Sequence, residues 1–197
     1  MVSQANGPRI GLEVAHAPLA MTRISNSQAP IELTPALLRD IGLFGALPED
    51  VLVRLTQTLK VVHVLAGTVL FKEGEDGRAM YVVLRGEVEV TKRSHRGTDA
   101  RMAILGPGDW FGEMSIVDVQ PRSASVVALA PSSLLMVTSN DLDQLYRQDL
   151  KAYSIIALNL ARELSRRLRV ADAILADLIA NVFDTMYARR ERTPPGQ

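Results

Sequence analysis

The middle of the chain consists of short apolar runs, which predict β-strands. Between residues 61 and 138, runs rich in valine, isoleucine and leucine are separated by turns that contain glycine or aspartate. Short strands with regular turn signals favour a β-sandwich or barrel, and here a jelly roll. The predicted strands are Val61–Leu65, Val69–Phe71, Met80–Leu84, Val88–Thr91, Met102–Leu105, Ser125–Leu129 and Leu134–Thr138.

Two helices are predicted ahead of these strands. Thr34 followed by Pro35 indicates an N-cap with proline at the first helical position. Apolar residues three and four apart continue this pattern to Leu47, and Pro48 opens a second helix that runs to Leu59. The predicted fold is therefore mainly β with flanking helices.

A long helix is predicted at the C-terminal end. Neither glycine nor proline occurs between Pro131 and Pro194, and helical periodicity runs from Asn140 to about Arg192. A heptad-like seam in this helix favours pairing with another helix, while apolar residues outside the seam favour contact with the barrel. The alternative is a helix that packs only on its own domain. The seam positions are Ser154, Ala157, Ala161, Leu164, Leu168, Ala171, Leu175, Leu178 and Val182.

The predicted domain organisation has four parts. Residues 1–31 mix glycine, proline and polar residues without a sustained period, which favours a flexible arm over a strap against the core. Residues 32–139 form the barrel with its N-terminal helices. Residues 140–192 form the long helix, as a lid or dimerisation element, and residues 193–197 a disordered tail.

The composition of the chain excludes several classes of function. The chain has 197 residues, 22 Lys+Arg, 22 Asp+Glu and no cysteine, which fits one domain with attachments. Balanced charge removes the long-range field of bulk nucleic-acid or anionic-membrane binders. The absence of cysteine excludes disulfides, thiolate nucleophiles and iron–sulfur clusters. With no secretory pattern or membrane span, the chain is predicted to be cytoplasmic.

Catalytic and metal sites are not predicted. The three histidines, His16, His63 and His95, stand far apart without acidic partners at ligand-like spacing. No combination of nucleophile, base and orienting group is visible, so the chain is not predicted to be an enzyme.

The segment 106–126 carries the candidate chemistry. Gly112 permits a tight backbone approach at the start of a short helical turn, and the N–H groups that follow, at Met114 and Ser115, suit a phosphate. Arg122 supplies a planar, permanently charged fork to the same phosphate.

Neighbouring residues extend this candidate site to a sugar. Ser123 adds a hydroxyl, and the Ser123 and Ala124 backbone adds N–H donors. Glu113 stands within reach as an acceptor for a ribose hydroxyl. An isolated Glu–Arg pair at this spacing is usually a solvated salt bridge, so the surrounding motif carries the interpretation. An anion receptor beside a hydroxyl receptor describes the sugar-phosphate of a nucleotide.

The sequence resembles a known family over roughly residues 33–178. Three segments carry the resemblance: Ile41–Pro48, Gly67–Val90 and Phe111–Ser125. They are similar to the cyclic nucleotide-binding domain of catabolite activator/FNR regulators, protein kinase regulatory subunits and cyclic nucleotide-gated channels. This resemblance implies that Glu113 binds the ribose 2′-hydroxyl. The implied ligand contacts are Gly112, Glu113, Met114, Ser115, Arg122, Ser123 and Ala124, with Val83 and Met102 beside the base.

The resemblance also implies a cyclic purine nucleotide as ligand, cAMP first. In the bacterial regulators, polar residues on the long helix recognise adenine, and here Ala171 and Asp172 take those positions. Ala171 has no hydrogen-bonding side chain, whereas Asp172 can accept from an exocyclic amine. Selection of cAMP over cGMP or a cyclic dinucleotide stays open.

The predicted output passes through the long helix. Related regulators follow this helix with a winged helix-turn-helix, but only about 20 residues follow Leu178, so no sequence-specific DNA binding is expected. The expected partner is a second copy, as a homodimer through the 154–182 seam, or another protein. The alternative function is a ligand-independent interaction module.

Overall fold

The computed structural model describes residues 31–95 and 97–191, with side chains as far as residue 183. The predicted N-terminal arm, apart from Ile31, and the predicted tail at residues 193–197 lie outside the described residues, so both stay predictions.

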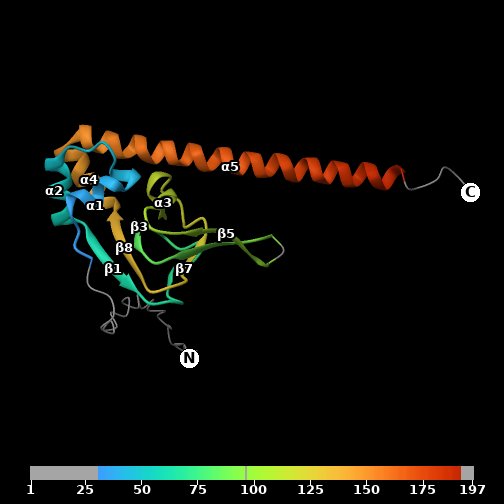
Figure 1. The fold of residues 1–197 in the computed structure, drawn as a ribbon, viewed down its shortest axis with the longest axis horizontal. Coiled ribbons are helices and arrows are strands. Elements are labelled where there is room, and N and C mark those ends of the chain that lie inside the picture. Colours follow the sequence, from blue (N-terminus) through green and yellow to red (C-terminus); the bar gives the residue numbers. More distant parts are fainter. Residues whose placement is uncertain (1–30, 96, 192–197) are drawn as a thin grey trace, which may run out of the picture. The chain divides into compact units, whose positions relative to one another are not determined.

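The described strands form two four-stranded antiparallel sheets (Figure 1). They are β1 (Lys60–Val64), β2 (Val69–Phe71), β3 (Ala79–Arg85), β4 (Val88–Arg93), β5 (Asp99–Leu105), β6 (Trp110–Phe111), β7 (Ser125–Ala128) and β8 (Ser132–Thr138). The sheet orders are β1-β8-β3-β6 and β2-β7-β4-β5. The predicted mainly β fold is confirmed. Strand β6 is an addition, because two residues are too few to give a periodic signal.

The helices ahead of the sheets are shorter than predicted. They are α1 (Pro35–Asp40), η1 (Gly42–Phe44) and α2 (Glu49–Thr58). The predicted start is confirmed, because the N–H of Leu37 donates to Oγ1 of Thr34 at 3.2 Å. At Ile41 the backbone becomes extended and only a 3₁₀ turn follows. Gly42 and Gly45 explain the interruption, since glycine is a poor helix former.

The C-terminal helix is two helices, not the single one predicted from Asn140. They are α4 (Ser139–Gln148) and α5 (Leu150–Glu191). Between them Asp149 has φ −152° and ψ 84°, and its carboxylate accepts from the N–H of Ala152 at 3.0 Å and from Arg54 at 3.0 Å. Asp149 thus caps a new helix, an effect that apolar periodicity does not register.

Strands β3 and β8 are covered on both faces. Met80 and Val82 of β3 join a core formed with the helices, whereas Val83 points into the interior between the two sheets with Leu134 of β8. Burial on both faces explains why these strands read as continuous apolar runs.

The first part of α5 packs on its own domain. Ile156 and Leu160 are buried in the core shared with the helices. Asn159 donates to the carbonyls of Leu43 and Gly45, both at 3.0 Å. The predicted contact between this helix and its own barrel is therefore confirmed.

The seam predicted along α5 lies largely open. Leu164 is half-buried and the other eight seam positions are exposed. Beyond Arg167 every described side chain of α5 is exposed, and the helix continues past the sheets (Figure 1). The predicted dimer contact stays a prediction.

Candidate functional site

The predicted tight turn lies at the end of β6. Gly112 has φ +81°, the left-handed region that favours glycine, and Glu113 then begins the short helix α3 (Met114–Val117). A Cβ at Gly112 would lie 2.6 Å from Nη1 of Arg122. Glycine is therefore required here both by the turn and by the arginine packed against it.

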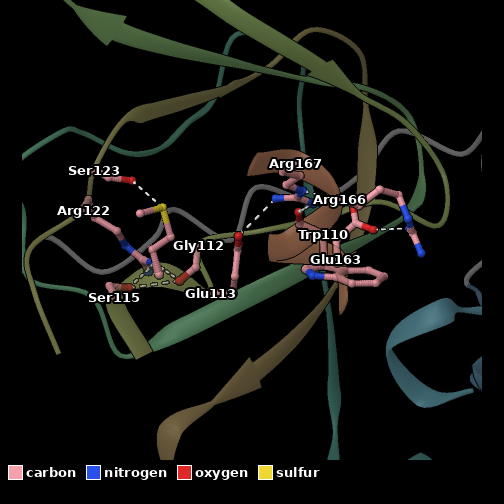
Figure 2. Close-up of polar contacts among 10 residues, drawn as sticks. Trp110, Gly112, Glu113, Ser115, Arg122, Ser123, Glu163, Arg166 and Arg167 are labelled. Carbon is pink, nitrogen blue, oxygen red and sulfur yellow. Dashed lines mark hydrogen bonds and ion pairs between the residues drawn. The ribbon is translucent and has the colours of Figure 1, made fainter. Parts of the chain in front are cut away.

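Arg122 is buried in a slot made mostly of backbone. It is 6% exposed. Its Nη1 donates to the carbonyl of Gly112 at 2.9 Å and to Oγ of Ser115 at 2.8 Å, and its Nη2 donates to the carbonyl of Ala79 at 2.7 Å (Figure 2). The guanidinium lies 3.9 Å over the ring of Phe71. These contacts hold the charge near the start of α3.

One donor of this guanidinium has no acceptor among the described residues. Nε of Arg122 is fully buried and unpaired. Gly77 approaches it so closely that a Cβ there would lie 2.3 Å from Nε. We call Phe71, Gly77, Ala79, Gly112 and Ser115 the Arg122 slot. A buried, unpaired donor is costly, and burial also lowers the pKa of Arg122, so the site fits an anionic acceptor such as a phosphate oxygen.

Glu113 is the second buried charge. It is 4% exposed, and its Oε1 accepts from Nη1 of Arg167 on α5 at 3.1 Å. Burial raises its pKa, and the charge of Arg167 acts in the opposite direction. Figure 2 shows Glu113 directed toward Arg167 and away from the Arg122 slot.

Arg167 joins α5 to the barrel beside this carboxylate. Its Nη2 donates to the carbonyl of Trp110 at 2.8 Å, and its Nε donates to Glu163 at 3.1 Å. Two strand and loop groups, Trp110 and Glu113, are thus tied to one helical arginine. The ribose-binding candidate is therefore part of the contact between α5 and the barrel.

The structure brings four of the predicted ligand residues together: Gly112, Glu113, Ser115 and Arg122. Met114 is exposed and Ser123 half-buried beside them, and the Ser123 hydroxyl donates to Sδ of Met114 at 3.4 Å. Ala124, next along the chain, is half-buried.

The remaining predicted residues lie apart from this group. Val83 is fully buried and packs in the interior core with Phe111. Met102 is 62% exposed at an irregularity of β5. Asp172 is exposed on α5, five residues beyond Arg167. Contacts of these three with a base stay predictions.

Sequence reasoning missed Arg167 and Gly77. Arg167 lies 54 positions from Glu113, and only the packing of α5 brings the two together. Gly77 reads as an ordinary turn glycine. For Arg167, the only signal in the sequence is that an arginine stands beside the buried face of a helix.

A hollow of about 530 Å³ lies beside the Arg122 slot. It is lined by residues of β2, the β2–β3 loop, β3 and the start of α4, and Arg122 alone belongs both to this lining and to the predicted ligand set. The lining residues are Leu70, Phe71, Glu75, Asp76, Gly77, Arg78, Ala79, Tyr81, Arg122, Thr138, Ser139 and Asn140.

The part of the chain that the structure describes contains neither a metal-binding side-chain cluster nor a membrane-spanning helix. Within it, no group of three or more histidine, aspartate or glutamate side chains could hold a metal ion. Its helices include none that combines the length and the apolar character needed to cross a membrane.

Known proteins share this domain. Residues 61–149 match the family described as the cyclic nucleotide-binding domain. A CRP-like cAMP-activated global transcriptional regulator of Mycobacterium tuberculosis is 34% identical over 73% of this chain and 62% of its own length. The cyclic AMP receptor protein of Thermus thermophilus is 38% identical over 69% and 60%. The crystal structure of a cyclic nucleotide-binding domain from Methylobacillus flagellatus has a TM-score of 0.66 at 29% identity, over 74% of this chain and 83% of that one.

The matched residues include the whole Arg122 slot and Glu113. The chain spans about three-fifths of the length of these curated relatives. The two antiparallel sheets and the buried arginine at the turn after β6 agree with the family match. The chain therefore contains a cyclic nucleotide-binding domain at residues 61–149, similar to the one in these relatives.

Proposed function

We propose that this chain is a non-enzymatic sensor that binds a cyclic purine mononucleotide, cAMP first, and passes the signal to α5. The observation that carries the proposal is the pair of buried charges on either side of Gly112. Arg122 offers a donor to an anion, and Glu113 offers an acceptor to a hydroxyl.

The phosphate half of the site is the Arg122 slot. A cyclic phosphate is a monoanion, and charge-assisted hydrogen bonds from a guanidinium are about twice as strong as neutral ones. The unpaired Nε supplies such a bond without breaking the contacts to Gly112, Ser115 and Ala79. Backbone groups at the start of α3 and at Ser123 and Ala124 complete the proposed phosphate contacts.

The ribose half connects the ligand to α5. A ribose 2′-hydroxyl that donates to Glu113 binds the same carboxylate that Arg167 contacts. Because every described side chain of α5 beyond Arg167 is exposed, this arginine is placed where α5 leaves the barrel. A change at Glu113 therefore alters how firmly α5 is held.

Recognition of the base is proposed for Asp172 on α5, with Val83 and Met102 on the strand side. A carboxylate at Asp172 accepts from the exocyclic amine of adenine. Guanine also carries an exocyclic amine, so this contact alone does not separate cAMP from cGMP.

The proposed output is a homodimer through the seam of α5, with a protein partner as the alternative output. Exposed apolar seam residues such as Leu168, Leu175 and Leu178 support a partner helix, because alternating three- and four-residue spacing is the pattern of coiled coils.

Calorimetry with cAMP and cGMP tests the proposal. We expect micromolar binding by the full chain and a loss of at least about 100-fold in Arg122→Ala, since charge-assisted bonds to the ligand disappear. Arg101→Ala is the matched control, because Arg101 is an exposed arginine of β5 paired with Glu89. Circular dichroism shows whether each variant folds. Absence of heat with both nucleotides would contradict the proposal.

A second candidate function is a ligand-independent interaction module. It is favoured by the three acceptors that the protein itself already offers to Arg122. Partner binding or self-association that is unchanged by either nucleotide, together with the absence of heat, would establish it.

A further inference from the structure

The distal part of α5 is apolar around much of its circumference. Of the 14 residues from 170 to 183, 11 are alanine, valine, isoleucine, leucine or phenylalanine, and the polar ones are Asp172, Asp177 and Asn181. All 14 side chains are exposed. A helix that is apolar on most sides is normally buried, so this segment requires cover.

A single partner helix is too narrow to cover the apolar surface of residues 170–183. At about 100° per residue, the seam positions of this segment form one stripe, with Ile174 on one flank and Ile179 and Phe183 on the other. The arc from Ile174 through the seam to Ile179 spans about 140° without a polar side chain, and Phe183 lies about 40° further round, beyond Asp172. A two-stranded coiled coil covers the seam and keeps polar flanks. Here the three flanking side chains are 56%, 47% and 55% exposed.

The proximal part of α5 differs. There the barrel covers one side of the helix through Ile156 and Leu160, and charged residues such as Arg162 and Arg166 occupy the solvent side. Apart from Leu150 and Leu158, the exposed apolar residues of this part belong to the seam, which leaves room for one partner helix. The two parts of α5 are therefore built for different numbers of neighbours.

We propose that the 170–183 segments of two seam dimers pack against each other, so that four copies of this chain form a four-helix bundle. The proposal goes beyond nucleotide sensing and rests only on the seam dimer. A seam dimer displays two copies of the Ile174 and Ile179 flanks about its two-fold axis, a self-complementary surface that a second dimer fits.

The placement of the barrel fixes the direction of approach. Each barrel packs on α5 as far as Arg167, so a second dimer reaches the 170–183 segment only from the opposite end. The two pairs of helices are then antiparallel and the barrels lie at the two ends of the bundle. The segment contains no lysine or arginine, which disfavours an anionic membrane surface as its cover.

Light scattering after size exclusion, on the full chain, tests the bundle. We expect a particle of four times the 21.5 kDa chain mass at micromolar concentration. Ile174→Glu with Ile179→Glu halves this mass, because a charged flank blocks the second dimer and leaves the seam intact. The matched control is Ala173→Glu with Ala180→Glu on the opposite alanine face, which leaves the mass unchanged.

The outcomes separate this proposal from the sensor. Wild-type protein that stays at one or two chain masses, a tetramer insensitive to the flank variant, or a particle that grows only with a second protein would each overturn the bundle. Leu168→Glu tests the seam itself and is expected to reduce the assembly below the dimer. Calorimetry on the flank variant is expected to show unchanged nucleotide affinity, so failure of the sensor proposal leaves the measured masses untouched.

Discussion

The two buried charges of the site are held in different ways, although both lie beside Gly112. Arg122 is fixed inside the barrel by carbonyl oxygens, a hydroxyl and an aromatic face. Glu113 is fixed by a cation from α5, a helix that the barrel only partly covers. The position of Arg122 thus depends on the barrel alone, whereas the surroundings of Glu113 depend on where α5 lies.

The largest expected effect comes from filling the space at Gly112. Gly112→Ala places a side chain at φ +81° and against Nη1 of Arg122, so we expect a loss of about 2–4 kcal/mol in unfolding free energy together with loss of nucleotide binding. Gly108→Ala is the matched control, because Gly108 has φ +91° with no atom within 4 Å. Denaturant unfolding of both variants separates backbone strain from displacement of the arginine. Equal losses in the two variants would show that the arginine contact contributes nothing.

A smaller effect is expected on the other side of the same guanidinium. Gly77→Ala crowds Nε of Arg122 and Oγ of Ser115, but it requires no left-handed backbone, so we expect about 1–2 kcal/mol of destabilisation and roughly tenfold weaker nucleotide binding. Gly106→Ala, with open space around its Cβ, is the control. Unfolding and calorimetry measure both quantities. Unchanged affinity would mean that the present position of Arg122 is irrelevant to the ligand.

The smallest effect concerns the pH dependence of Glu113. Burial raises its folded pKa above the ordinary value of 4.5, so the folded protein holds this proton more tightly than the unfolded chain does. This group therefore favours folding below pH 4.5, and its contribution is lost as pH rises through the folded pKa. Glu113→Gln removes that dependence, so its stability relative to wild type should increase with pH across this window. Urea unfolding at several pH values checks the slope, and an opposite slope would mean that Arg167 outweighs burial.

Much of the fold could be read from the sequence, for identifiable reasons. The apolar runs of β3 and β8 are buried on both faces, and the motif around Gly112 and Arg122 is local, so both give strong signals. The break at Asp149 could not be read, because a capping side chain ends one helix and starts another without disturbing the periodicity.

Contacts between distant residues were beyond the sequence. The pairing of Arg167 with Glu113 depends on where α5 crosses the end of β6, and the closeness of Gly77 to Arg122 depends on the β2–β3 loop. The exposure of Met102 likewise follows from an edge strand with an irregular register. Each of these depends on tertiary packing, which spacing along the chain does not encode.

Trp110 offers the most direct test of the link between nucleotide and helix. It is the only tryptophan in the chain, its carbonyl accepts from Arg167, and its ring lies 6.0 Å from that guanidinium. In a titration with cAMP, the tryptophan emission spectrum of the wild type is expected to change at the concentrations at which calorimetry detects binding. In Arg167→Ala at saturating cAMP the change should be absent. Binding without any change in wild-type emission, or an identical change in Arg167→Ala, would contradict the account.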